Sequence, residues 1–126
     1  MNMALYRGFR DLIVYQKSYK LAMEIYEITK SFPKEEKYSL IDQIRRSSRA
    51  VPANISAAWV RRKYPKFFIS KLLDALEEES ETEVWLDMSH DCKYIDDQSH
   101  KSLMERYNEI ARMLNSMINS PDKFCN

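Results

Sequence analysis

The sequence predicts an all-α protein folded as an antiparallel four-helix bundle, in which successive helices run up, down, up and down. The 126 residues contain a single glycine, Gly8, whereas sheet proteins and phosphate-binding loops need glycine at positions of positive φ. Four segments repeat apolar residues at the spacing of amphipathic helices, and the connections between them are short. A chain of this length forms one core, so residues 1–126 are expected to be one domain.

The first helix is expected over residues 10–31. It ends before Phe32-Pro33 because the residue that precedes a proline is pushed out of the α region. Its apolar residues form two adjacent strips. One strip contains Val14, Leu21, Ile25, Ile28 and Phe32, and the other contains Leu12, Tyr15, Tyr19, Ala22, Met23 and Tyr26. A helix that is apolar over so much of its circumference is expected to have more than one neighbour.

The second helix is expected over residues 39–63. Ser39, with Asp42 three residues later, resembles the capping box that begins many helices. Pro52 lies inside this helix and has no N–H to donate to the carbonyl of Ser48, which costs about 3 kcal/mol. We therefore expect a kink at Pro52, with a break into two short helices as the alternative.

The third helix is expected over residues 65–95, with Pro65 at its first position, and the fourth over residues 97–119. Part of the third helix's apolar surface, including Trp85, points away from its core-facing stripe. The fourth helix has five apolar residues in a strict 4-3-4-3 spacing that suits antiparallel packing. They are Leu103, Tyr107, Ile110, Leu114 and Met117. The surplus apolar faces of the first and third helices predict self-association.

Two carboxylates interrupt the core-facing stripe of the third helix. Glu79 and Glu83 share that stripe with Leu72, and an isolated buried charge costs several kcal/mol. Arg45 and Arg49 lie at one margin of the second helix's apolar stripe and are the expected ion-pair partners. The alternative is that these two arginines bind a ligand.

Charge is segregated along the chain although the formal net charge is only +1, so the whole protein attracts neither nucleic acid nor a membrane. Residues 61–71 hold five positive charges and no acid, whereas residues 74–87 hold seven acids and no base. No apolar run approaches the roughly 20 residues that cross a bilayer, and residues 1–11 lack the apolar core of a signal peptide. We therefore expect a cytoplasmic protein with free cysteines.

The sequence contains no motif typical of catalysis or metal binding. His90, Asp91 and Cys92 are consecutive, and consecutive helical residues point about 100° apart, so they cannot form a nucleophile and base pair. His100 has no metal-type spacing from His90. A di-metal site in a bundle would need Glu-x-x-His motifs on two helices, which the sequence lacks. We expect no enzyme activity, no metal and no cofactor.

The functional prediction rests on a basic cluster where the second helix ends and the third begins. It consists of Arg61, Arg62, Lys63 and Lys66, interrupted by Tyr64, with Arg46 and Lys71 as weaker members. Basic residues beside an aromatic ring suit salt-dependent contacts with phosphates and occasional base stacking, which predicts nucleic-acid binding. The alternative is that these cations only complement the dipole at a helix C-terminus.

Residues 9–119 resemble a known family. The most specific segments are 32–34 (FPK), 43–46 (QIRR) followed by 51–55 (VPANI), and 81–82 (ET). They resemble the four-helix-bundle proteins encoded in intervening sequences of bacterial 23S ribosomal RNA genes. They are also similar to the related accessory variability determinant proteins of diversity-generating retroelements. The stretch after Trp59 resembles these accessory proteins more than it resembles the intervening-sequence proteins.

The resemblance implies a barrel-like homopentamer and, for the retroelement relatives, binding of nucleic acid and a reverse transcriptase through a basic surface. The family usually has Ala-Glu-Gly after Asn-Ile, whereas this chain has Ser56-Ala57-Ala58, so roles of that glutamate and glycine do not carry over. Our first hypothesis is an oligomeric accessory protein that binds RNA or an RNA–DNA intermediate and docks a reverse transcriptase. The second is a protein–protein scaffold with no nucleic-acid role.

Overall fold

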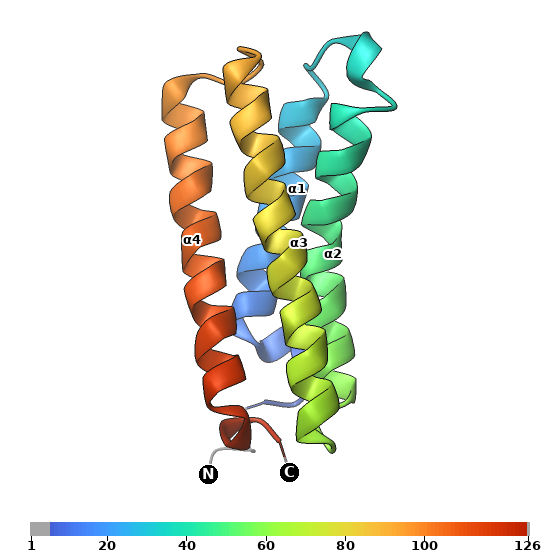
Figure 1. Cartoon of the computed structure of the whole chain (residues 1–126), viewed down its shortest axis with the longest axis vertical. Coiled ribbons are helices and arrows are strands. Elements are labelled where there is room, and N and C mark those ends of the chain that lie inside the picture. The colour runs from blue at the N-terminus through green and yellow to red at the C-terminus, as the bar shows by residue number, and fades with distance from the viewer. Residues whose placement is uncertain (1–5, 126) are drawn as a thin grey trace.

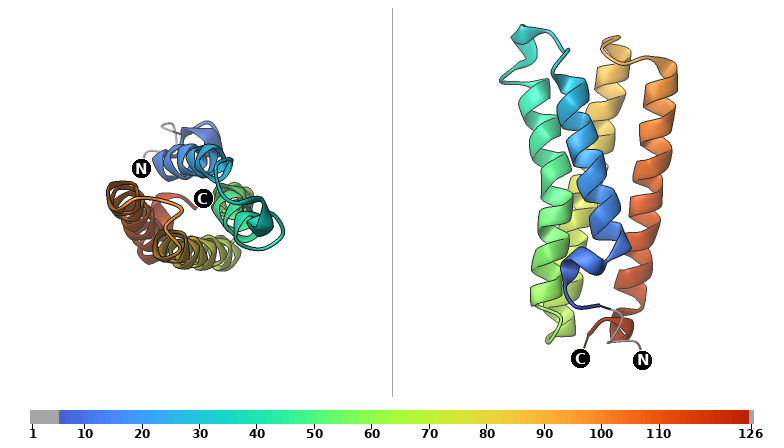
Figure 2. Two further views of the ribbon diagram at one scale, coloured as in Figure 1. Left: turned by 90° about the horizontal axis from the view of Figure 1, so that it is seen from above. Right: turned by 180° about the vertical axis from the view of Figure 1, so that it is seen from behind.

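The computed structural model describes residues 6–125, which form four long α-helices and no strand, so the all-α prediction is confirmed. The helices are α1 (Ile13–Thr29), α2 (Leu40–Val60), α3 (Pro65–Asp91) and α4 (Asp97–Asn119). Short 3₁₀ helices lie at Phe9–Asp11, Lys34–Glu36 and Pro121–Lys123. Figure 1 shows the four axes side by side, with α1 and α3 running in one direction and α2 and α4 in the other. Seen from above, each helix lies beside the next one along the chain, and α4 adjoins α1 (Figure 2).

The helix ends follow local backbone chemistry and lie inside several of the expected bounds. The 3₁₀ turn and an extended Leu12 delay the start of α1. α3 ends at Asp91 because Lys93 adopts a left-handed conformation with φ of 66°, and the N–H of Tyr94 donates to the carbonyl of Ser89 at 2.9 Å. α2 continues through Pro52 as one helix, so the alternative break is not formed, and the kink there stays a prediction.

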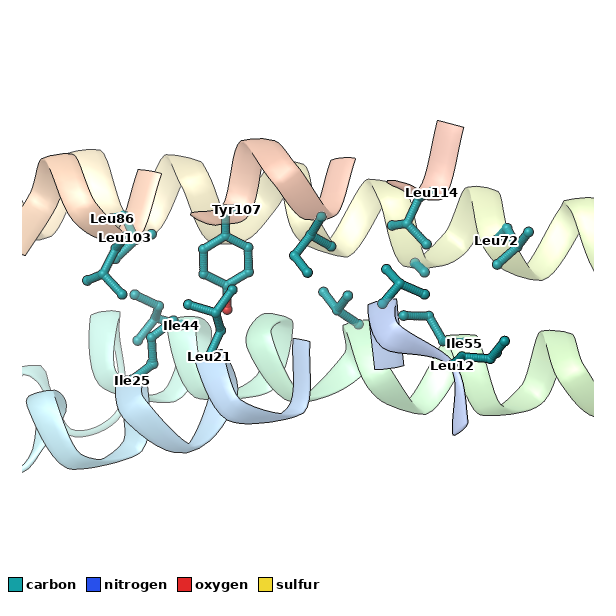
Figure 3. Close-up of a cluster of buried hydrophobic side chains, with 14 of the residues drawn as sticks. Leu12, Leu21, Ile25, Ile44, Ile55, Leu72, Leu86, Leu103, Tyr107 and Leu114 are labelled. Atoms are coloured by element: carbon teal, nitrogen blue, oxygen red, sulfur yellow. The ribbon is translucent and has the colours of Figure 1, made fainter. Parts of the chain in front are cut away.

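An apolar core fills the bundle along its length (Figure 3). The core residues of Figure 3 come from all four helices and from Leu12 just before α1. All five residues of the 4-3-4-3 pattern on α4 are buried, which confirms the face predicted for that helix. Polar contacts at the rim hold α1 to α4. Arg106 donates two hydrogen bonds to Glu24 at 2.6 and 2.8 Å, and the ammonium of Lys17 lies 3.0 Å from Glu109.

Glu79 is a buried acid inside this core, with only 2% of its surface exposed. Its Oε2 atom and the hydroxyl of Tyr107 are both buried without a hydrogen-bond partner among the described residues. The pKa of Glu79 is raised to about 9. Burial is the main cause, and the neighbouring Glu83 carboxyl contributes to the rise. Glu79 is therefore neutral in the folded protein at pH 7.

The raised pKa of Glu79 makes the stability of the folded protein depend on pH. Between about pH 5 and pH 9 the unfolded chain releases the Glu79 proton while the native state keeps it, so stability falls as pH rises. We expect Glu79→Gln to raise the free energy of unfolding at pH 7 by about 1–3 kcal/mol and to flatten this dependence. Urea unfolding at pH 5, 7 and 8.5 measures both effects. Glu81→Gln, an exposed position on the same helix, is the control and should change neither. Parallel pH profiles for wild type and Glu79→Gln would contradict the assignment.

Candidate nucleic-acid interface

The turn between α2 and α3 lies at the lower end of the bundle in Figure 1, the end that also holds the Pro121–Lys123 helix. The N–H of Arg61 donates to the carbonyls of Ala57 and Ala58, which closes α2, and the N–H of Tyr64 donates to the Arg61 carbonyl at 2.9 Å. Pro65 then begins α3 at a position where its missing N–H has no cost. The turn is therefore tight, and its side chains project from the end of the bundle.

We call the exposed residues of this turn and of the first turn of α3 the basic corner. They are Arg61, Lys63, Tyr64, Lys66 and Phe67. Within residues 6–125, none of the three cations lies within ion-pair distance of an acid. Tyr64 and Phe67 are 57% and 51% exposed, and their rings meet edge to face at 6.1 Å. The Nζ atom of Lys63 lies 6.0 Å from the Tyr64 ring centroid.

Arg62, the fourth member of the predicted cluster, has a different environment. Its guanidinium stacks on the Trp59 ring at 4.0 Å, and Nη1 donates to the Trp59 carbonyl at 2.9 Å. Its Nε atom is buried and has no hydrogen-bond partner within residues 6–125. These contacts match the structural alternative, in which a cation interacts with the carboxyl end of a helix.

The two weaker members do not belong to the basic corner. Arg46 is exposed, and its Nε lies 3.4 Å from Asp42. It precedes Arg61 by fifteen residues of α2, which places it about 22 Å away along the helix axis. Lys71 is half-buried on α3, with Nζ 3.4 Å from Asp74. The structure therefore brings Arg61, Lys63 and Lys66 together, whereas Arg46 lies in the amino-terminal half of α2.

The expected ion pairs between α2 and α3 are not formed within residues 6–125. Arg45 instead turns toward α1, where its Nε donates to Thr29 Oγ1 at 2.8 Å and its guanidinium lies 4.8 Å from the Tyr26 ring centroid. The guanidinium of Arg49 lies 5.7 Å from the same centroid. Both arginines thus lie on the α1 side of α2. Burial raises the pKa of the Tyr107 phenol on α4, and the nearby Glu79 carboxyl raises it further, so Glu79 lies near α4.

Phe67 is a corner residue that the sequence analysis did not single out. It follows Lys66 and lies about 100° around the helix from the fully buried Phe68. A helical-wheel projection with Phe68 at the centre of the buried face would therefore have placed Phe67 outside the core.

The histidines form a structural contact near the α3–α4 turn. The rings of His90 and His100 stack at 4.3 Å. The Nε2 atom of His90 lies 2.6 Å from Asp97 Oδ1, and the Nε2 atom of His100 lies 2.8 Å from Asp87 Oδ1. The Asp97 contact raises the pKa of His90 above its ordinary value. No group of three or more potential ligands able to hold a metal ion occurs in the described part of the chain.

The family model for the 23S rRNA-intervening sequence protein matches residues 10–116. The chain belongs to this family. Among solved structures, a protein of unknown function from the S23 ribosomal protein family of Bacteroides thetaiotaomicron is 32% identical, with a TM-score of 0.76. The match covers 85% of this chain and 96% of that chain.

No curated protein matches the chain. The resemblance to intervening-sequence proteins is confirmed, and the link to retroelement accessory proteins stays a prediction. No helix within residues 6–125 of this family member has the length and hydropathy required to span a bilayer.

The contacts of Arg45 predict a moderate effect on stability. Arg45→Ala should lower the free energy of unfolding by about 1–2 kcal/mol, because it removes a hydrogen bond and a cation–π contact but leaves no buried carboxylate uncompensated. Arg46→Ala is the control, and since its ion pair is exposed it should cost less than about 0.5 kcal/mol. Urea unfolding of both variants gives the comparison. A loss above about 3 kcal/mol for Arg45→Ala would indicate a buried carboxylate partner.

Proposed function

We propose that this protein is a non-enzymatic, oligomeric accessory protein that binds RNA or an RNA–DNA intermediate through the basic corner. The observation that carries the proposal is the set of three exposed cations without acidic partners beside two exposed aromatic rings. Cations supply affinity for phosphates, and exposed rings accept unpaired bases. The description of the family, a protein of 23S rRNA intervening sequences, supports RNA as the nucleic acid.

Two further features of the basic corner favour an anionic ligand. The first turn of α3 contains no acid, and the amino end of this 27-residue helix carries the positive end of its dipole. The corner also lies at the end of the bundle, at the turn between α2 and α3. Three cations per chain are few, and a homopentamer, which the family resemblance implies, would repeat them around a ring and raise the avidity.

A reverse transcriptase is the proposed protein partner, on the basis of the likeness to retroelement accessory proteins. A reverse-transcriptase gene beside the gene for this protein would support that part of the proposal. Co-purification of the two proteins tests it directly, and separate elution of the pair at micromolar concentrations would count against it.

A protein–protein scaffold is the second candidate function, and one observation favours it. The outward face of α3 carries Leu73, Val84 and Met88, which are 47%, 46% and 47% exposed. Exposed apolar residues in line on one helix are typical of an interface with another protein or another copy of the chain. This surface and the basic corner have no residue in common, so the two candidate functions have different tests.

Charge reversal of the basic corner tests the proposed function. We expect Arg61→Glu, Lys63→Glu and Lys66→Glu together to weaken binding of a labelled 20-nucleotide RNA by about a hundredfold in 50 mM salt, because phosphate contacts dominate affinity. Fluorescence anisotropy gives the affinity, and circular dichroism shows whether the bundle is intact. For the wild type, the logarithm of affinity should fall linearly with the logarithm of salt concentration.

The matched control reverses three exposed lysines elsewhere, with the same change in net charge. Lys34→Glu, Lys37→Glu and Lys101→Glu together should alter affinity by less than about threefold, since these residues lie away from the corner. Equal losses in both triple variants would mean that net charge, and not the corner, controls binding. Undiminished RNA binding by the corner variant in low salt would contradict the proposal.

A further inference from the structure

Residues of α1 and α2, together with Phe9, line a groove on the surface of the protein. The right view of Figure 2 shows α1 and α2 side by side. The main lining residues of the groove are Phe9, Tyr15, Tyr19, Met23, Arg49 and Pro52. A second hollow continues from Tyr15 and Tyr19 toward Arg10 and Lys20. We call these two hollows together the α1–α2 groove.

Aromatic rings follow one another along the α1 side of this groove. The ring centroids of Phe9 and Tyr15 lie 5.0 Å apart, and those of Tyr15 and Tyr19 lie 5.9 Å apart. Tyr19 is 50% exposed and Met23 is 48% exposed, so these side chains are accessible from outside. Phe9 and Tyr15 are half-buried and meet edge to face, and Tyr19 is the exposed ring of the row, so a flat ligand would reach Tyr19 first.

The charged residues that line the groove are positive, and Glu24 and Glu109 line the adjoining hollow on the α4 side of Tyr19. Arg10 lies 4.5 Å from the Phe9 ring centroid, and Arg49 lines the groove from the α2 side. No acid lines either of the two hollows that form the groove. The acids nearest along α1 are engaged elsewhere, because Glu24 pairs with Arg106 of α4 and Glu27 pairs with Lys30. Arg10, Lys20 and Arg49 therefore face solvent without an acidic partner among residues 6–125.

We propose that the α1–α2 groove binds a single-stranded segment of nucleic acid. Unpaired bases stack on Tyr15 and Tyr19, and Arg10, Lys20 and Arg49 contact the phosphates. Stacking on aromatic rings inside a positively charged groove is the general mode by which proteins bind single strands without sequence preference. The inference rests on the proposed function and extends it, because it distinguishes single strands from duplexes.

The groove and the basic corner both have residues near the carboxyl end of α2. Ser56 lines the groove, and it precedes Arg61 by five residues, or about 8 Å along the helix axis. In the proposed complex, one strand contacts the corner with its phosphates and the groove with its bases.

The charge of the groove favours nucleic acid over a second copy of the chain as the occupant. Exposed acids Glu77 and Glu81 lie among the exposed apolar residues of α3, and that mixed surface is typical of a protein interface. The groove instead combines unpaired cations with rings, which suits a polyanion with flat bases.

The test compares single-stranded and duplex RNA of equal length on the full chain. We expect Tyr19→Ala to weaken binding of a labelled 12-nucleotide single strand by about tenfold, because it removes one stacking platform. Binding of the 12-base-pair duplex should change by less than about twofold, since paired bases cannot stack on the ring. Tyr19→Phe keeps the ring and should bind like the wild type. Leu73→Ala, at an apolar residue of similar exposure on α3, is the control.

The outcomes separate this inference from the proposed function. If the wild type binds RNA, the corner variant does not, and Tyr19→Ala binds the single strand as well as the wild type, the groove inference alone is overturned. If no RNA binds in low salt, the proposed function fails and the groove inference fails with it. Light scattering completes the test, because a change in oligomer mass for Tyr19→Ala would show that a second copy occupies the groove and would overturn the inference.

Discussion

The close packing of α2 against α3 determines where every other surface of the molecule lies. Small buried residues, including Val51 and Ala58 on α2 and Ala75 on α3, let the two helices approach closely over much of their length. Thr82 adds a buried hydrogen bond, donating to Ser47 Oγ across the two helices at 2.8 Å. Once this pair is fixed, α1 and α4 cover its remaining apolar surface, and the α2–α3 turn is left at the free end of the bundle.

The same packing explains why Arg45 and Glu79 do not meet. Each residue lies beside the α2–α3 contact, but on opposite sides of it, so one contacts α1 and the other lies near Tyr107 of α4. Arg45 lies at a partly exposed position, with a hydroxyl and a ring as partners. Glu79 forms no ion pair within residues 6–125 and avoids the cost of a buried charge by keeping its proton.

The sequence could predict the features that depend on local periodicity. The spacing of apolar residues on α4 identified its buried face, because that spacing is set by the helix alone. The partner of Arg45 could not be predicted, since it depends on how each helix is rotated and on which neighbour lies beside it. The role of Arg62 was equally hidden, because its contact with Trp59 depends on the shape of the turn that follows α2.

The distribution of the exposed side chains gives the molecule two different faces. The α1–α2 face combines rings with cations, and the outward face of α3 combines apolar residues with the acids Glu77 and Glu81. In a ring of identical subunits, each chain contributes two unlike patches, one to each neighbour. If α3 provided one patch, the α1–α2 face would stay available only if the second patch lay outside that face. The α1–α4 seam opens into hollows beside Lys17 and Met113, but the hollow beside Lys17 is also lined by Tyr19, Lys20 and Met23 of the α1–α2 groove. A neighbouring subunit seated in that hollow would therefore compete with nucleic acid for the same side chains.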